Sequence, residues 1–432
     1  MSELAAVPLQ TTFTGRNEFM NEPTELREWM AGMRLGVAGA ALALVAILVT
    51  AVFSGSAQAQ TFTLLYTFTG GADGGDPIGG LIMDTQDNLY GTTAEGGNAA
   101  CPHGCGTVFK LDTTGKETVL YSFTGTGKDG FFPSASLVRD AQGNLYGTTQ
   151  GGGIGKYGTV FELDPTGNET ILYNFTGAGD GGTPRSGLVL DDRGNLYGTT
   201  DSGGNLTCDG GLGCGTVFKV GPSGTETVLH SFTGMGGDGV VPSGGLALDA
   251  QGNLYGTTEF GGEYGSPSGY GTVFKVDGTG KETVLHSFNL TDGYDPLGVL
   301  VIDARGNLYG TTRLSSGRGP DELNGVVFRL NKSDKESVLY RFDRPEDGYG
   351  PTAGVVRDAQ GNLYGTTVAG GRWNCGTVFK IDKGKETLLY VFTGGSDGAS
   401  PYAGLVQDAQ GNLYGTTSGS FGTGGTVFKI AP

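Results

Sequence analysis

Residues 140–149 read Asp-Ala-Gln-Gly-Asn-Leu-Tyr-Gly-Thr-Thr, and the last six letters of this stretch occur seven times in the chain. The copies begin at Asn88, Asn144, Asn195, Asn253, Asn307, Asn362 and Asn412, which are separated by 56, 51, 58, 54, 55 and 50 residues. Self-similarity at such a period is typical of repeat architectures. The hexapeptide therefore divides the chain into seven units.

Each unit contains four segments rich in Val, Leu, Tyr, Phe and Thr, the residues that suit a pleated and half-buried surface. In the first unit these segments are residues 80–84, 88–93, 106–111 and 117–123. Alternation in the fourth segment places Val119, Tyr121 and Phe123 on one face. Short turns with Gly, such as Gly115, join the strands and predict antiparallel pairing. Four antiparallel strands in about 50 residues match one blade of a β-propeller.

The ends of the chain predict how the ring closes. Residues 61–68 form a lone fourth strand, and residues 425–430 form a third strand with no successor. The last blade is therefore expected to borrow its fourth strand from the N-terminal end, which removes the edges that a linear array would expose. We predict an all-β fold, a seven-bladed β-propeller over residues 60–432.

The N-terminal region predicts export. Residues 35–53 are a 19-residue apolar run that follows Arg16, Arg27 and Arg34, and no further Lys or Arg occurs before Lys110. The positive-inside rule then places everything after residue 60 outside the cytoplasm, in the periplasm or the medium.

Two interpretations of residues 35–59 stay open. Small residues at Ala57 and Ala59 fit a signal-peptide cleavage before Gln60. The run is also long enough to remain as a membrane anchor, since a spanning helix takes about 20 residues. Residues 1–34 form a cytoplasmic segment, or reflect a true start at Met30 or Met33.

Charge excludes one class of partner. The chain carries 27 basic and 44 acidic residues, a formal net charge of −17. Nucleic-acid binding normally needs a basic stripe, so no nucleic-acid partner is expected. An anionic membrane surface is disfavoured for the same reason, and membrane contact is expected only through residues 35–53 if they are retained. We expect a monomer.

The motifs resemble a known family. Three motifs are similar to the bacterial GloVer tandem repeat of exported "choice-of-anchor" proteins: Gly-Asn-Leu-Tyr-Gly-Thr-Thr, Gly-Thr-Val-Phe-Lys and Glu-Thr-Val-Leu-Tyr-Ser-Phe. The order of the strands within each unit is similar to that of NHL-type propellers. The resemblance covers nearly all of residues 61–432. It implies export and carries no established activity.

An Asp-Gly-x-x-Pro motif precedes the first strand of every unit. Its aspartates are Asp73, Asp129, Asp180, Asp238, Asp292, Asp347 and Asp397. A turn in which Asp accepts hydrogen bonds from backbone amides explains a residue present in every unit. The alternative is a set of Ca²⁺ ligands near the channel, because hard cations take oxygen ligands. No other cofactor is expected.

Residues that depart from the repeat are the better functional candidates. All five cysteines lie in loops between second and third strands. Two close pairs, Cys101 with Cys105 and Cys208 with Cys214, predict local disulfides in an exported protein, and Cys375 is left as a buried free thiol. Cys101, His103 and Cys105 together offer three ligands to Zn²⁺ as the alternative.

Two histidines, His230 and His286, fill a fourth-strand slot that Tyr holds in the other five units, and we interpret them as aromatic replacements. The remaining candidates are aromatic residues of the variable loops, which can stack on sugar rings or can pack against neighbouring loops. They are Tyr157, Tyr264, Tyr270, Tyr294, Tyr349, Trp373 and Tyr402.

These observations favour an exported, non-catalytic propeller that binds an extracellular glycan or protein or serves as a scaffold. No catalytic residue can be assigned. The alternative is an extracellular enzyme that acts on a glycan or peptide through loop carboxylates such as Glu95, Glu259, Glu263 or Glu322.

Overall fold

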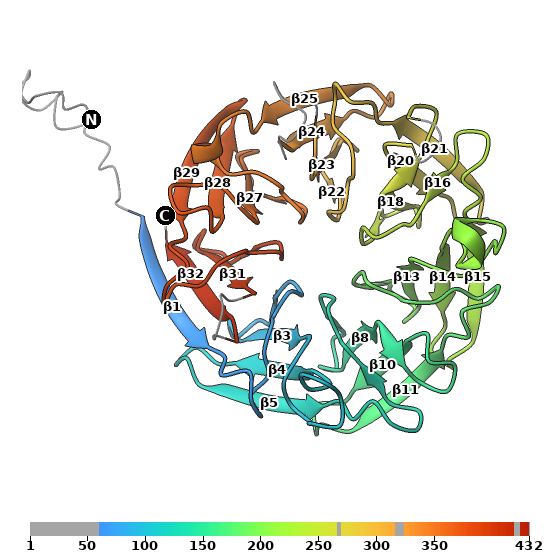
Figure 1. The fold of residues 1–432 in the computed structure, drawn as a ribbon, viewed down its shortest axis with the longest axis horizontal. Helices are drawn as coiled ribbons and strands as arrows, with labels where there is room; N and C mark the ends of the chain where they lie inside the picture. Colours follow the sequence, from blue (N-terminus) through green and yellow to red (C-terminus); the bar gives the residue numbers. More distant parts are fainter. Residues whose placement is uncertain (1–59, 266–268, 316–323, 419–423, 432) are drawn as a thin grey trace, which may run out of the picture. The chain divides into compact units, whose positions relative to one another are not determined.

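The computed structural model describes residues 60–265, 269–315, 324–418 and 424–431, and residues 1–59 lie outside the described residues. Seven four-stranded antiparallel sheets form a closed ring, with the first strand of each sheet nearest the axis and the fourth at the circumference (Figure 1). The prediction of a seven-bladed all-β propeller is confirmed. In the described part of the chain no helix is long and apolar enough to cross a bilayer.

Each blade runs from an inner strand at the axis to an outer strand at the circumference, and short elements of the loops add to the ring. Blade 1 is β2 (Ile82–Met83), β3 (Leu89–Thr93), β4 (Thr107–Leu111) and β5 (Glu117–Ser122). Blade 2 is β7 (Val138–Arg139), β8 (Leu145–Thr149), β10 (Thr159–Leu163) and β11 (Glu169–Asn174). Blade 3 is β12 (Val189–Leu190), β13 (Leu196–Thr200), β14 (Thr216–Val220) and β15 (Glu226–Ser231). Blade 4 is β17 (Ala247–Leu248), β18 (Leu254–Thr258), β20 (Thr272–Val276) and β21 (Glu282–Ser287). Blade 5 is β22 (Val301–Ile302), β23 (Leu308–Thr312), β24 (Val326–Leu330) and β25 (Glu336–Arg341). Blade 6 is β26 (Val356–Arg357), β27 (Leu363–Thr367), β28 (Thr377–Asp382) and β29 (Lys385–Val391). Blade 7 is β30 (Val406–Gln407), β31 (Leu413–Thr417), β32 (Thr426–Ala431) and β1 (Thr61–Thr67).

The loops contain further short elements. They are β6 (Gly130–Phe131) paired with β9 (Gly151–Gly152), β16 (Gly239–Val240) paired with β19 (Phe260–Gly261), and the 3-10 turns η1 (Asp209–Gly211) and η2 (Pro345–Asp347).

Most residues of the hexapeptide have a structural role that is visible in blade 1. The Asp84 carboxylate accepts hydrogen bonds from the Asn88 backbone and side-chain nitrogens, both at 2.9 Å, and from the Tyr90 hydroxyl at 3.0 Å. Gly91 has no side chain because a Cβ there would meet the Phe109 ring at 2.7 Å. The Thr93 hydroxyl bonds the Thr107 hydroxyl of the next strand at 2.8 Å. These residues are therefore fixed by the fold.

Phenylalanine pairs join each blade to the next. The ring of Phe123, the residue after β5, meets the ring of Phe161 in β10 edge-on at 5.1 Å, and both side chains are fully buried. An equivalent pair occurs at each of the other six seams. Edge-to-face aromatic pairs of this kind stabilise the packing beyond simple area burial.

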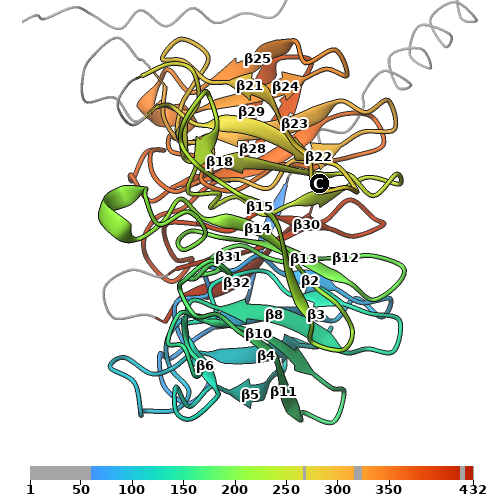
Figure 2. The same cartoon turned by 90° about the vertical axis from the view of Figure 1, so that its right-hand side faces the viewer.

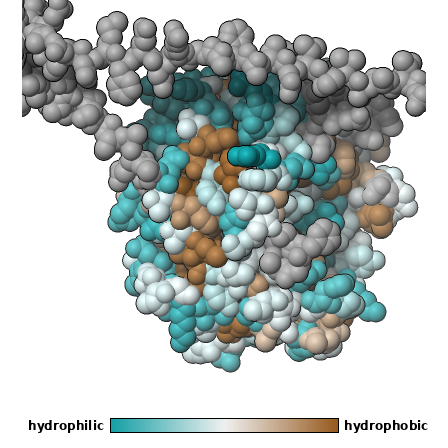
Figure 3. Space-filling model, turned by 60° about the vertical axis from the view of Figure 1, so that its left-hand side comes forward, coloured by the Kyte–Doolittle hydropathy of each residue, from teal (hydrophilic) through white to brown (hydrophobic). Residues whose placement is uncertain are grey.

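The ring closes as predicted. β1 pairs antiparallel with β32, from Thr61 opposite Ala431 to Thr67 opposite Thr426. Phe68 then supplies the Phe pair of the closing seam, with its ring 5.0 Å from that of Phe109. On the side of the ring that carries β1 and β29, apolar groups reach the surface between polar ones (Figure 3), and Leu64 of β1 is 38% exposed.

Two local expectations need correction. The first strand of each blade is shorter than predicted, since in blade 1 only Ile82–Met83 pair with β3. Strict alternation in the fourth strand is wrong as well, because a β-bulge lets Tyr121 pair with Val108 while Val119 pairs with Phe109. The bulged residue Leu120 turns toward the core, where it packs in the same cluster as Tyr121.

Candidate functional site

The long loops share one face of the ring. In every blade the loop from second to third strand contacts the Asp-Gly-x-x-Pro loop, as in the bridge of Gly75 with Glu95. We call this side the loop face. Seen from the side, η1 projects from it (Figure 2). The tight turns lie on the opposite face, because they join the other ends of the same strands.

The seven aspartates of the Asp-Gly-x-x-Pro motif hold their own loops together. The Asp73 carboxylate accepts hydrogen bonds from the Thr69 amide at 2.8 Å, from the Thr69 hydroxyl and from the Tyr66 hydroxyl at 3.1 Å. Tyr121, Tyr173, Tyr340 and Tyr390 donate in the same way to the aspartates that follow them. The geometry is that of the turn interpretation, and the seven carboxylates remain in seven separate loops.

The residue before each motif proline adopts a positive φ in every blade. Phe132, at 61°, donates its amide to the carbonyl of Cys105 in the preceding blade and accepts from the Gln150 amide of its own blade. Even the β-branched Val241 adopts this conformation, at 58°, although such residues rarely do. These two backbone hydrogen bonds hold the residue after the hexapeptide, such as Gln150, and the residue after the proline, such as Ser134, at the inner end of the loop face.

A channel runs along the ring axis between the first strands. All seven blades line it with the segment that follows the motif proline, and it encloses a cavity of about 340 Å³. Most of the lining is Gly, Ala and Ser, as at Gly79, Ala135 and Gly187. Arg185 is the charged residue of this lining, and Ser243 is one of its serines.

The position after the hexapeptide is charged in three consecutive blades only. It reads Ala94, Gln150, Asp201, Glu259, Arg313, Val368 and Ser418 in chain order. Arg185 Nε lies 3.1 Å from Asp201 Oδ2, and Arg313 Nε lies 2.6 Å from Asp295 Oδ2. Between these ion pairs the Ser243 hydroxyl donates to Glu259 Oε2 at 3.3 Å. We call Arg185, Asp201, Ser243, Glu259, Asp295 and Arg313 the mouth cluster.

Burial separates the roles within the mouth cluster. The side chains of Asp201 and Asp295 are 11% and 5% exposed, whereas those of Arg185 and Arg313 are 54% and 42% exposed. Burial raises the pKa of Asp201 to about 7 against the opposing effect of Arg185, and raises that of Asp295 to about 6 against Arg313. Burial also raises the pKa of Glu259, while Arg313 and Ser243 lower it. The Arg185 and Arg313 side chains are thus exposed to solvent, and each forms an ion pair with a carboxylate that lies deeper in the protein.

The predicted loop carboxylates separate into different environments. Glu259 belongs to the mouth cluster. Glu95 lies beside Asp76, where burial and then the charge of Glu95 raise the pKa of Asp76 to about 6. Glu263 lines a separate shallow pocket with Tyr264 and His286. Glu322 lies outside the described residues. The sequence motifs did not predict the mouth cluster, although a comparison of the seven residues after the hexapeptide would have signalled it.

The predicted aromatic residues divide into two groups. Tyr157, Tyr264, Trp373 and Tyr402 are 45%, 49%, 54% and 47% exposed on the loop face. Tyr270 and Tyr294 are half-buried and pack ring against ring at 5.7 Å, and the half-buried Tyr349 donates its hydroxyl to Asn374. The second group serves loop packing, so four of the seven remain available to a ligand.

The histidines take the tyrosine slot, as interpreted from the sequence. His230 packs edge-on against Phe232 at 4.7 Å, as Tyr121 does against Phe123 at 5.1 Å. A glutamate from the fourth strand of the next blade reaches six of the seven seams, all except the seam between blades 6 and 7, where Phe62 of β1 stacks on Tyr390. At these six seams burial and then the motif aspartate raise the pKa of the glutamate to about 7. These residues are Glu117, Glu169, Glu226, Glu282, Glu336 and Glu386.

Both predicted disulfides are present. Cys101 bonds Cys105 and Cys208 bonds Cys214, with Cα–Cα distances of 5.1 and 5.3 Å. This pairing leaves no thiolate pair for zinc beside His103. Cys375 is free, but it is half-buried and not buried as expected, and its Sγ lies 3.3 Å from the Trp373 carbonyl oxygen.

The family model of the Gloeobacter/Verrucomicrobia repeat matches residues 50–210 and 205–428. The chain belongs to this repeat family. No curated protein matches this repeat protein. Membership and the two disulfides are compatible with an extracellular protein.

Two solved structures are similar to this chain at low identity. The extracellular domain of a B. thetaiotaomicron protein assigned as a one-component system is 15% identical, with a TM-score of 0.52 over 86% of this repeat protein and 41% of that chain. A gluconolactonase from Xanthomonas campestris is 16% identical, with a TM-score of 0.42 over 74% of this chain and 90% of that one. At 15% identity the likeness to the B. thetaiotaomicron domain shows the fold alone.

Proposed function

We propose that this repeat protein is an extracellular binding propeller that holds the end of a glycan at the loop-face mouth of its channel. The observation that carries the proposal is the mouth cluster, which breaks the repeat in blades 3 to 5 and opens onto the axial cavity. In a repeat fold, a residue present in every unit serves the fold. A set of coordinated departures at one point of the ring is therefore the best candidate for a ligand site.

The chemistry of the mouth cluster suits a neutral, hydroxyl-rich ligand. Two guanidinium groups stand among three carboxyl groups, and two of those have pKa values raised to about 6 and 7. The cluster therefore nearly balances its own charge near neutral pH. It offers fixed N–H donors from Arg185 and Arg313 and an acceptor at Glu259, which together match the alternating donors and acceptors of a sugar.

The surrounding surface supports the same ligand class. Tyr402 follows the motif proline of blade 7, the position that Arg185 holds in blade 3, and it is 47% exposed directly before the channel-lining residues Ala403 and Gly404. An exposed aromatic ring provides a flat apolar surface on which a sugar ring can stack. The small residues of the lining leave room for a chain end to enter.

A direct test is a glycan array probed with the full chain, followed by calorimetry with the best binder. We expect Glu259→Gln and Arg313→Gln each to weaken binding by about tenfold or more, since each removes a charge-assisted hydrogen bond. Arg305→Gln, in a tight turn on the opposite face, is the matched control. The proposal fails if no glycan binds, or if the mouth variants bind as the unaltered chain does.

An extracellular hydrolase is the second candidate, favoured by one observation. Asp201, with a pKa near 7, lies close enough to Glu259 for the two charges to interact. A protonated carboxyl beside an ionised one is the pairing that glycoside hydrolysis uses. Incubation of the best-binding glycan with the protein should then release product, and Asp201→Asn should stop the release. Unchanged glycan would exclude this candidate.

A further inference from the structure

Four of the six glutamate seams at the circumference carry a tyrosine, whereas the seams between blades 3 and 4 and between blades 4 and 5 carry a histidine. In the tyrosine seams the phenol hydroxyl donates to the motif aspartate, at 3.0 Å between Tyr173 and Asp180 and at 2.7 Å between Tyr340 and Asp347. Between blades 3 and 4, His230 replaces the tyrosine. Its Nε2 atom lies 3.5 Å from Asp238 Oδ1, which is too long for a normal hydrogen bond.

The substitution changes both the space and the chemistry of the seam. An imidazole is shorter than a phenol, so the polar end of the side chain is withdrawn from the aspartate. A neutral imidazole also has one nitrogen with a lone pair that can bind a metal ion, which a phenol hydroxyl does not offer in the same way. Glu282 Oε1 is buried without a hydrogen-bond partner among the described residues, as is the Oε1 atom of every seam glutamate, and the substitution adds His230 Nε2 as a second such atom in this seam. Such orphaned atoms normally have a ligand, an ion or a water.

These three side chains converge. In the part of the chain that the structure describes, His230, Asp238 and Glu282 are the one group of three His, Cys, Asp or Glu residues whose ligand atoms all lie within 4.8 Å of one another. Ligand atoms on a tetrahedral zinc ion, each at about 2.0–2.2 Å from the metal, are about 3.3–3.5 Å apart. His230 and Asp238 already have that separation, and the flexible Glu282 side chain needs only a small approach.

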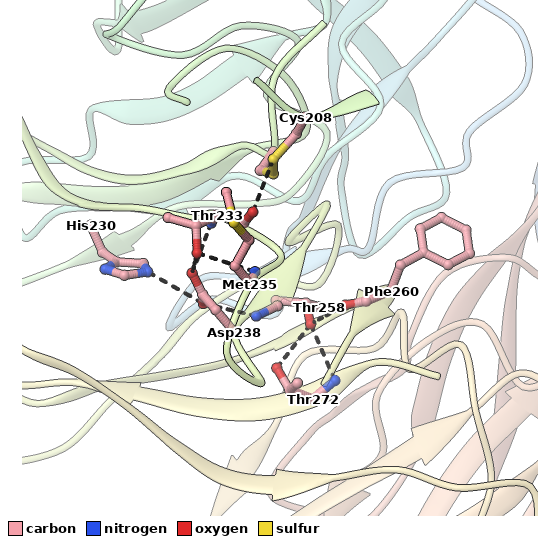
Figure 4. Close-up of polar contacts among 10 residues, drawn as sticks. Cys208, His230, Thr233, Met235, Asp238, Thr258, Phe260 and Thr272 are labelled. Carbon is pink, nitrogen blue, oxygen red and sulfur yellow. Dashed lines mark hydrogen bonds and ion pairs between the residues drawn. A yellow bond between two sulfur atoms is a disulfide. The ribbon is translucent and has the colours of Figure 1, made fainter. Parts of the chain in front are cut away.

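The neighbours of the group hold it in place. Figure 4 shows the His230 ring and the Asp238 carboxylate pointing toward each other across the seam. Asp238 Oδ2 accepts from the Thr233 amide at 2.7 Å and from its hydroxyl at 2.8 Å, and Oδ1 accepts from the Gly239 amide at 2.8 Å. The edge-on contact with Phe232 fixes the imidazole. Orientation of ligands by such outer contacts is usual at metal sites.

We propose that His230, Asp238 and Glu282 bind a zinc ion at the outer seam of blades 3 and 4. One imidazole nitrogen and two carboxylate oxygens are ligands that zinc accepts, and three protein ligands leave its fourth position to water. The site lies at the fourth strands on the circumference of the ring, whereas the mouth cluster lies at the axial channel. It does not depend on the glycan-binding proposal.

The next seam provides a natural control within the same chain. His286 lies 3.2 Å from Asp292, but Asn289 replaces the usual threonine and donates to both oxygens of Asp292 at 2.8 Å. The Arg341 side chain adds a positive charge near Glu336, whose pKa it lowers against the larger effect of burial. His286 Nε2 and Glu336 Oε1 also lack a hydrogen-bond partner among the described residues. Asn289 however occupies both oxygens of Asp292, and the ligand atoms of His286, Asp292 and Glu336 do not all lie within 4.8 Å of one another, so we expect this seam to bind no zinc.

The experiment is calorimetric titration of the metal-free full chain with zinc chloride at about pH 7.5, where the ligands lose their protons to the metal. One ion should bind per chain with a micromolar or lower Kd. His230→Tyr, which installs the residue of five other units, should preserve the fold and raise the Kd on the order of 100-fold, and Glu282→Gln should raise it at least about tenfold. His286→Tyr should leave the Kd unchanged.

A second readout separates the site from other binding. Cobalt in place of zinc should give the intense visible absorption of a four-coordinate ion in the unaltered chain and in His286→Tyr, and lose it in His230→Tyr. Three results would overturn the proposal: no zinc bound at millimolar concentration, binding that survives in a folded His230→Tyr chain, or binding that is lost with His103→Ala instead.

Discussion

Replacing Phe68 by Ala tests the closure of the ring. Phe68 is 1% exposed, and its ring makes the closing-seam contact with Phe109 at 5.0 Å. Phe123 occupies the same slot inside the chain, with 0% exposure and a 5.1 Å contact with Phe161. If β1 is a full member of blade 7, both substitutions remove equivalent core contacts. Truncating a buried Phe to Ala costs about 3–5 kcal/mol.

The expected shift in melting temperature follows from the size of the domain. With an unfolding entropy of about 2.1 cal/mol/K per residue over about 370 residues, each 1 kcal/mol lowers the midpoint by about 1.3 °C. Phe68→Ala and Phe123→Ala should therefore each lower it by about 4–6 °C. Differential scanning calorimetry of both variants and the unaltered chain measures this. A shift of about 5 °C for Phe123→Ala with less than about 1 °C for Phe68→Ala would show that β1 contributes little to closure and would refute the reasoning.

Three further predictions concern pH, redox state and export. The six seam glutamates have pKa values of about 7 in the folded chain against an ordinary 4.5, so between these pH values the folded chain keeps protons that the unfolded chain has released. The melting temperature should therefore fall as pH rises from 4.5 through 7, and it should fall less steeply in Glu169→Gln. A melting temperature that rises over this range would contradict the assignment. Reduction of Cys101–Cys105 and Cys208–Cys214 should increase proteolysis in those two loops but lower the melting temperature little, because a disulfide that closes so short a loop contributes only roughly 2 kcal/mol. Peptide mapping after limited proteolysis, before and after reduction, measures this. Unfolding of the whole ring on reduction would be the contrary result. Intact mass of protein recovered from its native host should give an N-terminus at Gln60, whereas recovery of residues 30–59 with the membrane fraction would identify an anchor.

The sequence alone determined the architecture because the signal is local and repeated. Hydrophobic alternation, turn glycines and a fixed period predict strands, blades and their number without any long-range contact. The pairing that closes the ring also followed, since a lone fourth strand at one end and a lone third strand at the other are complementary. The two disulfides were predictable for the same reason, as each joins residues only four or six positions apart.

The tertiary structure alone decided where polar side chains converge. Asp201, Glu259 and Arg313 lie 58 and 54 residues apart in the chain, and each is an ordinary polar residue in its own loop. The ring brings equivalent positions of adjacent blades together at the channel mouth, and burial there shifts their pKa values. His230, Asp238 and Glu282 meet in the same way across a seam. The bulge at Leu120 likewise depends on packing against the neighbouring blade, which no alternation within one strand can reveal.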